Sequence, residues 1–223
     1  MYPDNATLGE ETMNAADLLF LLEHRLHLVA LGVFLLVYAA RLVWLFRLGT
    51  PQDFAIHSGD ARKGIAYAFA TLFMPWSMES TRKHWRMYLE FAIFHIGLGV
   101  MIASTFLFPY APQILAPPVN FIFAALMAAA LVAGLLRIAR RVTQPKMRAI
   151  STWDDYFSIV MVCLLLFTCS LAVFGSVPWR IAYYILVSVL LIYVPFSKIS
   201  HYLYWPFARF LYGYELGRRG LVK

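Results

Sequence analysis

Long apolar runs separated by short polar and basic segments dominate the hydropathy pattern of this chain. Five of them have roughly the 20 residues with which an apolar helix crosses a bilayer. They lie at 26–46, 87–108, 119–138, 156–174 and 179–201. The pattern therefore predicts an all-α integral membrane bundle of five transmembrane helices, organised as a single domain over residues 1–223.

Helix-terminating residues mark several boundaries of these runs. Asn14 is a candidate N-cap, so we expect the first helix to begin well before residue 26. Pro109 ends the second run, and Pro117 and Pro118 precede the third. These residues predict where the separate helices begin and end.

A shorter apolar stretch, 64–78, lies between the first two runs and contains Pro75 and Trp76 near its end. Basic residues flank it, among them Arg62 and Arg82. An apolar segment of this length between basic residues is typical of a helix lying in the headgroup layer. We therefore expect an interfacial helix in the first loop, with a docking surface for a cytoplasmic partner as the alternative.

Composition and charge narrow the class of protein. Hydrophobic residues make up 61% of the chain and charged residues 14%, against about 45–50% and 25% in soluble domains. The net charge of +7 comes from basic residues beside the apolar runs, which indicates membrane orientation rather than nucleic-acid binding. Cys163 and Cys169 share one run without a haem-attachment motif, so both are expected to be small buried groups.

The basic residues gather in alternate loops. The segment before the first run is acidic, with Asp4, Glu10 and Glu11, and resembles no cleavable signal peptide. The basic loops and the tail contain Arg41, Arg47, Arg62, Lys63, Arg82, Lys83, Arg86, Arg137, Arg140, Arg141, Lys146, Arg148, Arg209, Arg218, Arg219 and Lys223. The positive-inside rule therefore predicts an outside N-terminus and a cytoplasmic C-terminus, with the first run as its own insertion signal.

Two histidines in apolar surroundings are the main candidates for chemistry. His95 lies within the second run, about 12 Å from its cytoplasmic end at the helical rise, and His201 ends the fifth run. An ionisable ring inside a span is costly and indicates a functional site. Because both imidazoles are expected in the cytoplasmic half of the membrane, we predict that they bind one haem iron between the second and fifth helices. Two axial nitrogens suit electron transfer, because no iron position stays open.

Charged residues near these histidines extend the candidate site. The cations expected to receive the haem propionates are Lys83, Arg86, Lys198 and Arg209. Glu90 precedes His95 by about one and a half turns. Three roles stay open for it: a hydrogen bond to a quinone, acceptance of a proton, or an ion pair with Lys198 or Arg86. His24 and His27 begin the first run, where three roles stay open: an outer haem ligand, a proton-handling edge of a quinone pocket, or an interfacial polar collar.

Two short motifs carry a resemblance to a known family. Phe94-His95-Ile96-Gly97-Leu98 and Pro195-Phe196-Ser197-Lys198-Ile199-Ser200-His201, with Pro206 five residues on, resemble the gamma (cytochrome b) subunit of respiratory nitrate reductase. They are also similar to the membrane cytochrome b subunits of heterodisulfide-reductase-like, sulfite-reduction-associated and high-molecular-weight cytochrome complexes. The five spans and the outside N-terminus agree with this resemblance.

The resemblance implies a function. The chain would be a haem b subunit of a prokaryotic inner-membrane oxidoreductase, with His95 and His201 as the axial pair of the haem nearer the cytoplasm. It would pass electrons between menaquinone or ubiquinone and iron–sulfur or catalytic subunits on the cytoplasmic face. A periplasmic cytochrome is a further candidate partner, and the chain would not be catalytic alone.

The chain departs from the family at the second haem. Members with two haems have ligands where this chain has Thr105 and Tyr183, neither of which is an ordinary b-haem ligand. One haem is therefore expected, and a second only if His24 or His27 binds it by a different geometry.

Two other classes of function compete with the haem hypothesis. One is a non-haem subunit that only anchors partner proteins in the membrane. The other is a small transporter or an intramembrane enzyme, which the sequence disfavours because it shows no inverted repeat and no nucleophile–base arrangement within the runs.

Overall fold

The computed structural model describes residues 13–48, 57–77 and 79–222. Asp4, Glu10, Glu11 and Met78, the last residue of the expected interfacial segment, lie outside the described residues. Five helical segments are long and apolar enough to cross a membrane: Ala15–Arg47, Trp85–Tyr110, Val119–Thr143, Trp153–Ala172 and Val177–Phe196. The chain is an all-helical, multi-pass membrane protein over this part of its length, as the hydropathy pattern predicts.

The first of these segments is one continuous helical rod. It consists of α1 (Ala15–Leu21), the π-helical turn η1 (Leu22–Leu26) and α2 (His27–Arg47). The Asn14 side chain accepts hydrogen bonds from the backbone N–H groups of Ala16 and Asp17, both at 2.9 Å. The predicted N-cap is therefore confirmed.

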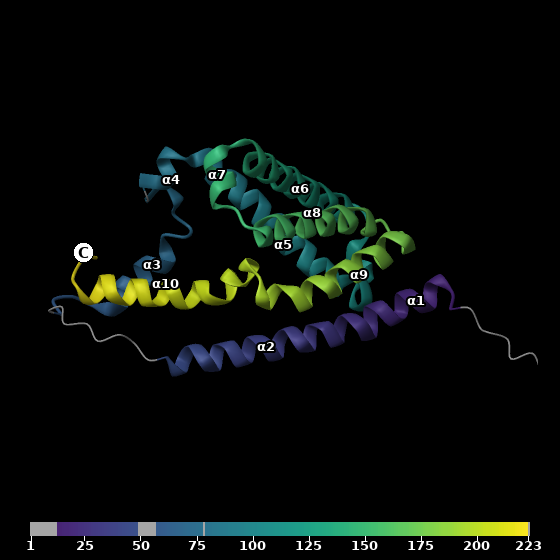
Figure 1. Ribbon diagram of the computed structural model, residues 1–223, viewed down its shortest axis with the longest axis horizontal. Helices are drawn as coiled ribbons and strands as arrows, with labels where there is room; N and C mark the ends of the chain where they lie inside the picture. The colour runs from purple at the N-terminus through teal and green to yellow at the C-terminus, as the bar shows by residue number, and fades with distance from the viewer. Residues whose placement is uncertain (1–12, 49–56, 78, 223) are drawn as a thin grey trace, which may run out of the picture.

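The remaining spans pack side by side in chain order. They are α5 (Trp85–Tyr110), α6 (Val119–Thr143), α8 (Trp153–Ala172) and α9 (Val177–Tyr193). Helix α6 packs against both α5 and α8, α8 packs against α9, and α9 packs against α2 (Figure 1). We call the end of the bundle that contains the starts of α1 and α9 the N-terminal end. The opposite end, which contains the ends of α2 and α9, is the C-terminal end.

Short elements connect or follow the spans. They are α3 (Ala61–Ala70), η2 (Pro75–Ser77), α4 (Glu79–Lys83), η3 (Pro112–Leu115), α7 (Pro145–Ile150), η4 (Val194–Phe196), η5 (Lys198–Ser200) and α10 (His201–Arg218). Helix α10 continues beyond α9 at the C-terminal end, and α3 lies along it (Figure 1).

Small residues allow the spans to approach closely. A Cβ added at Gly97 of α5 would lie 2.2 Å from the Cβ of Ala130 in α6. At Gly134 of α6 it would lie 2.6 Å from the Sγ of Cys163 in α8. Transmembrane helices pack through such positions because lipid offers no hydrophobic driving force between them. Cys163 is a buried free thiol, as expected.

Helix α3 packs closely against α10, which covers one of its faces. A Cβ at Gly64 would lie 2.1 Å from the carbonyl oxygen of Gly213, and a Cβ at Gly217 would lie 2.8 Å from the Cα of Gly64. These backbones therefore touch, and larger residues would separate the two helices. The first part of the apolar stretch 64–78 therefore belongs to a helix, α3, that is paired with α10.

The fifth predicted run is shorter in the structure than in the sequence pattern. Helix α9 ends at Tyr193, and two 3₁₀ turns separate it from α10, whose first residue is His201. Pro195 has no N–H to donate within a helix, and Ser197 is extended, with φ −102° and ψ 172°. The expected single run 179–201 is therefore wrong at its end: His201 lies after a helix break.

Candidate functional site

His95 lies in α5 and is anchored by its own helix. Its Nδ1 is 2.8 Å from the carbonyl oxygen of Phe91, one turn earlier, and the two rings stack with centroids 3.9 Å apart. A carbonyl oxygen only accepts, so Nδ1 carries the proton in this bond. The ring is half-buried.

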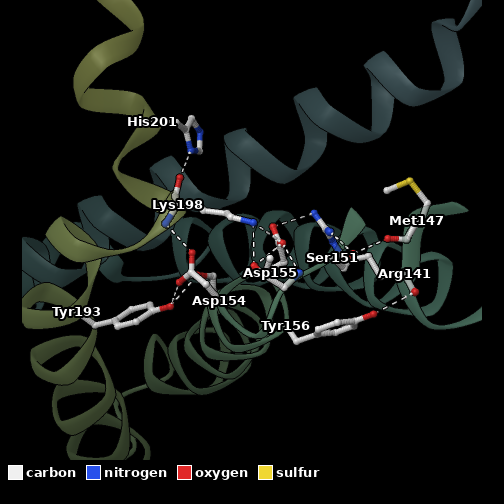
Figure 2. A network of polar contacts seen from close by, with 11 residues as sticks. Arg141, Met147, Ser151, Asp154, Asp155, Tyr156, Tyr193, Lys198 and His201 are labelled. Atoms are coloured by element: carbon white, nitrogen blue, oxygen red, sulfur yellow. Dashed lines mark hydrogen bonds and ion pairs between the residues drawn. The ribbon is translucent and has the colours of Figure 1, made fainter. Parts of the chain in front are cut away.

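His201 is anchored in the same way at the start of α10. Its Nδ1 is 3.0 Å from the carbonyl oxygen of Lys198, and the ring is exposed (Figure 2). This bond again places the proton on Nδ1. Both histidines therefore present an unprotonated Nε2 when neutral.

The two imidazoles lie within electrostatic reach of each other although 105 residues separate them in the chain. Among the described residues, neither Nε2 has a hydrogen-bond partner. Metal-binding histidines typically donate one ring N–H to a carbonyl and ligate through the other nitrogen. The pair therefore fits the two axial ligands of a haem iron.

The described residues fit other metal sites less well. No group of three or more His, Cys, Asp or Glu side chains gathers in them as ligands would around zinc or a di-iron centre. A haem needs only two axial protein ligands, because its own macrocycle supplies the other iron-binding nitrogens.

The expected propionate cations have protein partners. Lys83 pairs with Glu79 at 2.6 Å, and Arg209 donates to the Ala68 carbonyl and the Thr71 hydroxyl at 2.7 and 2.8 Å. Lys198 pairs with an acidic residue of α8, described below. Arg86 lies 5.7 Å from the centroid of the Trp85 ring.

Arg137 of α6 places a positively charged guanidinium within electrostatic reach of His95. It lies 4.5 Å from the centroid of the Phe94 ring, and its charge acts on the His95 imidazole. Glu90 holds it, with Nε 3.5 Å from the carboxylate, and Arg140 pairs with the same carboxylate. Glu90 is therefore paired, but with Arg137 and Arg140 of α6 and not with Lys198 or Arg86.

A polar network at the C-terminal end joins α8, α9 and the turn before His201 (Figure 2). Asp155 accepts from Lys198 Nζ at 2.6 Å and from the Thr152 backbone N–H at 2.8 Å. Asp154 accepts from the backbone N–H of Lys198 at 2.8 Å and from the Tyr193 hydroxyl. The segment that carries His201 is therefore tied to α8 by both acidic residues.

A buried ion pair lies at the N-terminal end. Glu23, in the π-helical turn η1, is only 5% exposed and pairs with Arg180 at the start of α9. Arg180 also donates to the Phe108 carbonyl at 3.3 Å, so it links η1, α5 and α9. Ionised groups in such surroundings persist only when paired. A cavity of about 200 Å³ adjoins Arg180.

His24 and His27 have different surroundings although they are three residues apart. His27 is 1% exposed and lies edge-on to the rings of Phe106 and Tyr184. Its Nδ1 is near the Glu23 carbonyl but makes no well-formed hydrogen bond. His24 is half-buried with its ring against Phe20. Only His27 is a buried, incompletely satisfied imidazole.

Thr105 and Tyr183, the positions at which the resemblance expects further haem ligands, contact each other. Their hydroxyl groups are 2.5 Å apart, and Tyr183 also donates to the Met101 carbonyl at 3.1 Å. Tyr184 donates to the Thr105 carbonyl at 2.7 Å. Both tyrosines are fully buried, so their rings fill the space between α5 and α9 at this level.

Four residues at the two ends of the bundle were not predicted from the sequence as parts of a site: Glu23, Arg180, Arg137 and Asp154. Glu23 and Arg180 were detectable in principle, since opposite charges begin two runs on the same predicted side of the membrane. Arg137 was used only to predict the topology. Nothing in the sequence indicated the role of Asp154, because it bonds a main-chain N–H.

The chain gives no significant match to protein-family models, curated proteins or solved structures.

Proposed function

We propose that this protein is a haem b-bearing membrane subunit of a respiratory oxidoreductase, with His95 and His201 as axial ligands. One observation carries the proposal: two neighbouring imidazoles from different helices each donate Nδ1–H to a backbone carbonyl and leave Nε2 free. Such outer hydrogen bonds fix the ring orientation and the tautomer that a metal ligand requires.

The haem would supply reversible one-electron transfer within the bilayer. His95 and His201 would hold its iron, and two histidine ligands would suit electron transfer rather than the binding of oxygen or substrate. Arg137, held by Glu90 beside His95, supplies a positive charge for a propionate. The charge distribution supports an outside N-terminus and a cytoplasmic C-terminus. The inner membrane of a prokaryote is part of the same proposal and comes from the family resemblance.

The other components belong to the same proposal. Menaquinone or ubiquinone exchanges electrons with the haem, and His24, His27 or Glu90 take part in proton handling. Iron–sulfur or catalytic subunits dock on the cytoplasmic face, and a periplasmic cytochrome is a candidate on the other. The direct contact between Thr105 and Tyr183 supports one haem rather than two.

The test is the haem content of the purified full-length chain. We expect a reduced b-type α band and, in the pyridine haemochrome assay, one haem per chain. His95→Ala and His201→Ala should each lose at least nine-tenths of the haem, since one axial bond is removed. His57→Ala, at an exposed site, is the matched control and should retain wild-type content.

A wild-type chain without a b-type band would exclude the proposal and leave the non-haem membrane anchor. Wild-type haem content in both alanine variants would show that other residues bind the iron.

A further inference from the structure

Two adjacent acidic residues at the start of α8 contact different parts of Lys198. Asp155 accepts from its side chain, with Nζ 2.6 Å away, and also caps α8 at Thr152. Asp154 instead accepts from its backbone N–H at 2.8 Å. One carboxylate therefore holds a flexible side chain, and the other holds the main chain itself.

The main chain of Lys198 is bonded in two directions. Its N–H donates to Asp154, and its carbonyl accepts from His201 Nδ1 at 3.0 Å (Figure 2). The carbonyl that orients His201 therefore belongs to a residue that Asp154 holds in place. Without this tie, the polar contacts between Lys198 and α8 are those of its flexible side chain, to Asp155 and Thr152.

Asp154 is itself fixed by α9. It accepts a hydrogen bond from the Tyr193 hydroxyl, and the Ser158 hydroxyl lies 3.4 Å from the same carboxylate oxygen. Tyr193 and Ser158 are also 3.3 Å apart through their hydroxyl oxygens. Asp154 thus joins α8, the last turn of α9 and the segment leading to α10, the three elements that determine where the His201 ring lies.

We propose that Asp154 is the positioning residue of His201: through the Lys198 main chain it sets the orientation of this imidazole and its strength as a haem ligand. The inference rests on the proposed haem function. The Lys198 N–H belongs to the peptide group that it shares with Ser197, so Asp154 acts on the neighbouring Lys198 carbonyl by fixing its position and through its own negative charge. A carbonyl held in place accepts the His201 Nδ1–H more strongly, which makes the ligating Nε2 more basic and stabilises ferric haem.

The experiment compares full-length variants in detergent, with haem bound. Asp154→Ala removes the acceptor and the charge, Asp154→Asn keeps an acceptor oxygen without the charge, and Asp155→Asn is the matched control one residue away. Lys198→Met removes the lysine ammonium but retains its backbone N–H. The readouts are the g values of the low-spin ferric haem, its midpoint potential, and amide hydrogen exchange over residues 197–203.

We expect Asp154→Ala to shift the highest g value, to raise the midpoint potential, and to speed exchange of the Lys198 amide at least tenfold. Asp154→Asn should raise the potential with smaller effects on exchange. Asp155→Asn should leave the g values unchanged, because the contact between Asp154 and the main chain persists. For the same reason Lys198→Met should leave the exchange rate of the backbone amide at position 198 unchanged. A purely structural role would lower stability equally at Asp154 and Asp155 without a selective change in potential.

Unchanged g values and potential in Asp154→Ala would overturn the inference, as would equal shifts in Asp155→Asn. If Asp154→Ala fails to fold, Asp154→Asn decides through its potential. A wild-type chain that binds no haem would instead refute the proposed function. Hydrogen exchange would then still test whether Asp154 holds the His201 segment, and unchanged exchange would refute that as well.

Discussion

Both ends of the helical bundle contain histidines beside paired charges, but the hydrogen bonding of the imidazole nitrogens differs between them. At the C-terminal end, His95 and His201 satisfy Nδ1 locally and leave Nε2 free, and charged residues anchor the surrounding backbone. At the N-terminal end, His27 is enclosed by aromatic rings and its Nδ1 is unsatisfied. The two ends therefore differ in the ring nitrogen that has no partner among the described residues: Nε2 in His95 and His201, and Nδ1 in His27.

The two ends also differ in how their space is used. Tyr183 and Tyr184 are fully buried at the N-terminal end, and their hydroxyl groups bond to α5. At the C-terminal end, His201 is exposed after a helix break. Between α5 and α9 the N-terminal end is closed by direct helix packing, apart from the cavity beside Arg180, whereas the His201 ring at the C-terminal end is accessible.

The largest effect should come from breaking the ion pair of the closed end. Glu23→Ala leaves Arg180 buried without its counter-ion, and a buried charge that loses its partner costs about 3–5 kcal/mol. We expect a correspondingly large loss of thermal stability in detergent. The double variant Glu23→Leu with Arg180→Leu should recover most of it. Equal instability of the single and double variants would show that the pair does not act as a unit.

An intermediate effect is expected where Tyr183 closes the space between α5 and α9. Tyr183→Phe keeps the ring but removes the hydrogen bonds to Thr105 and Met101. Hydrogen bonds between membrane helices contribute about 0.6 kcal/mol each and at most about 1.7. We expect stability to fall by about 1 kcal/mol in chemical unfolding, with haem content unchanged. A loss of haem in this variant would place the cofactor at the closed end.

The smallest effect should come from His27. His27→Leu replaces a buried ring without a well-formed hydrogen bond by an apolar side chain, and volume-conserving core changes usually cost less than about 1.5 kcal/mol. Stability should stay within about 1 kcal/mol of wild type in thermal unfolding, and haem content should not change. His95→Leu is the matched comparison and should lose its haem. A haem deficit in His27→Leu would remove the distinction between the two ends.

The membrane-spanning architecture was predictable from the sequence to within a few residues at most boundaries. The exception is the fifth run, where hydropathy continues through Pro195 and Phe196 while the helix stops at Tyr193. Hydropathy averages over a window and does not detect that proline removes a backbone donor. For the candidate site, residue type and depth singled out His95 and His201, whose role as ligands stays a prediction, but they did not indicate that Arg137 and Asp154 surround them.

Local sequence determines which segments of this protein enter a bilayer, because transfer of an apolar helix depends on its own side chains. It also determines the Asn14 cap, whose contacts lie within three residues. Tertiary structure decided which charges meet: Glu23 with Arg180, Glu90 with Arg137, and Asp154 with the main chain of Lys198. These contacts join residues far apart in the chain, so they exist only once the helices have packed, and hydropathy carries no information about that packing.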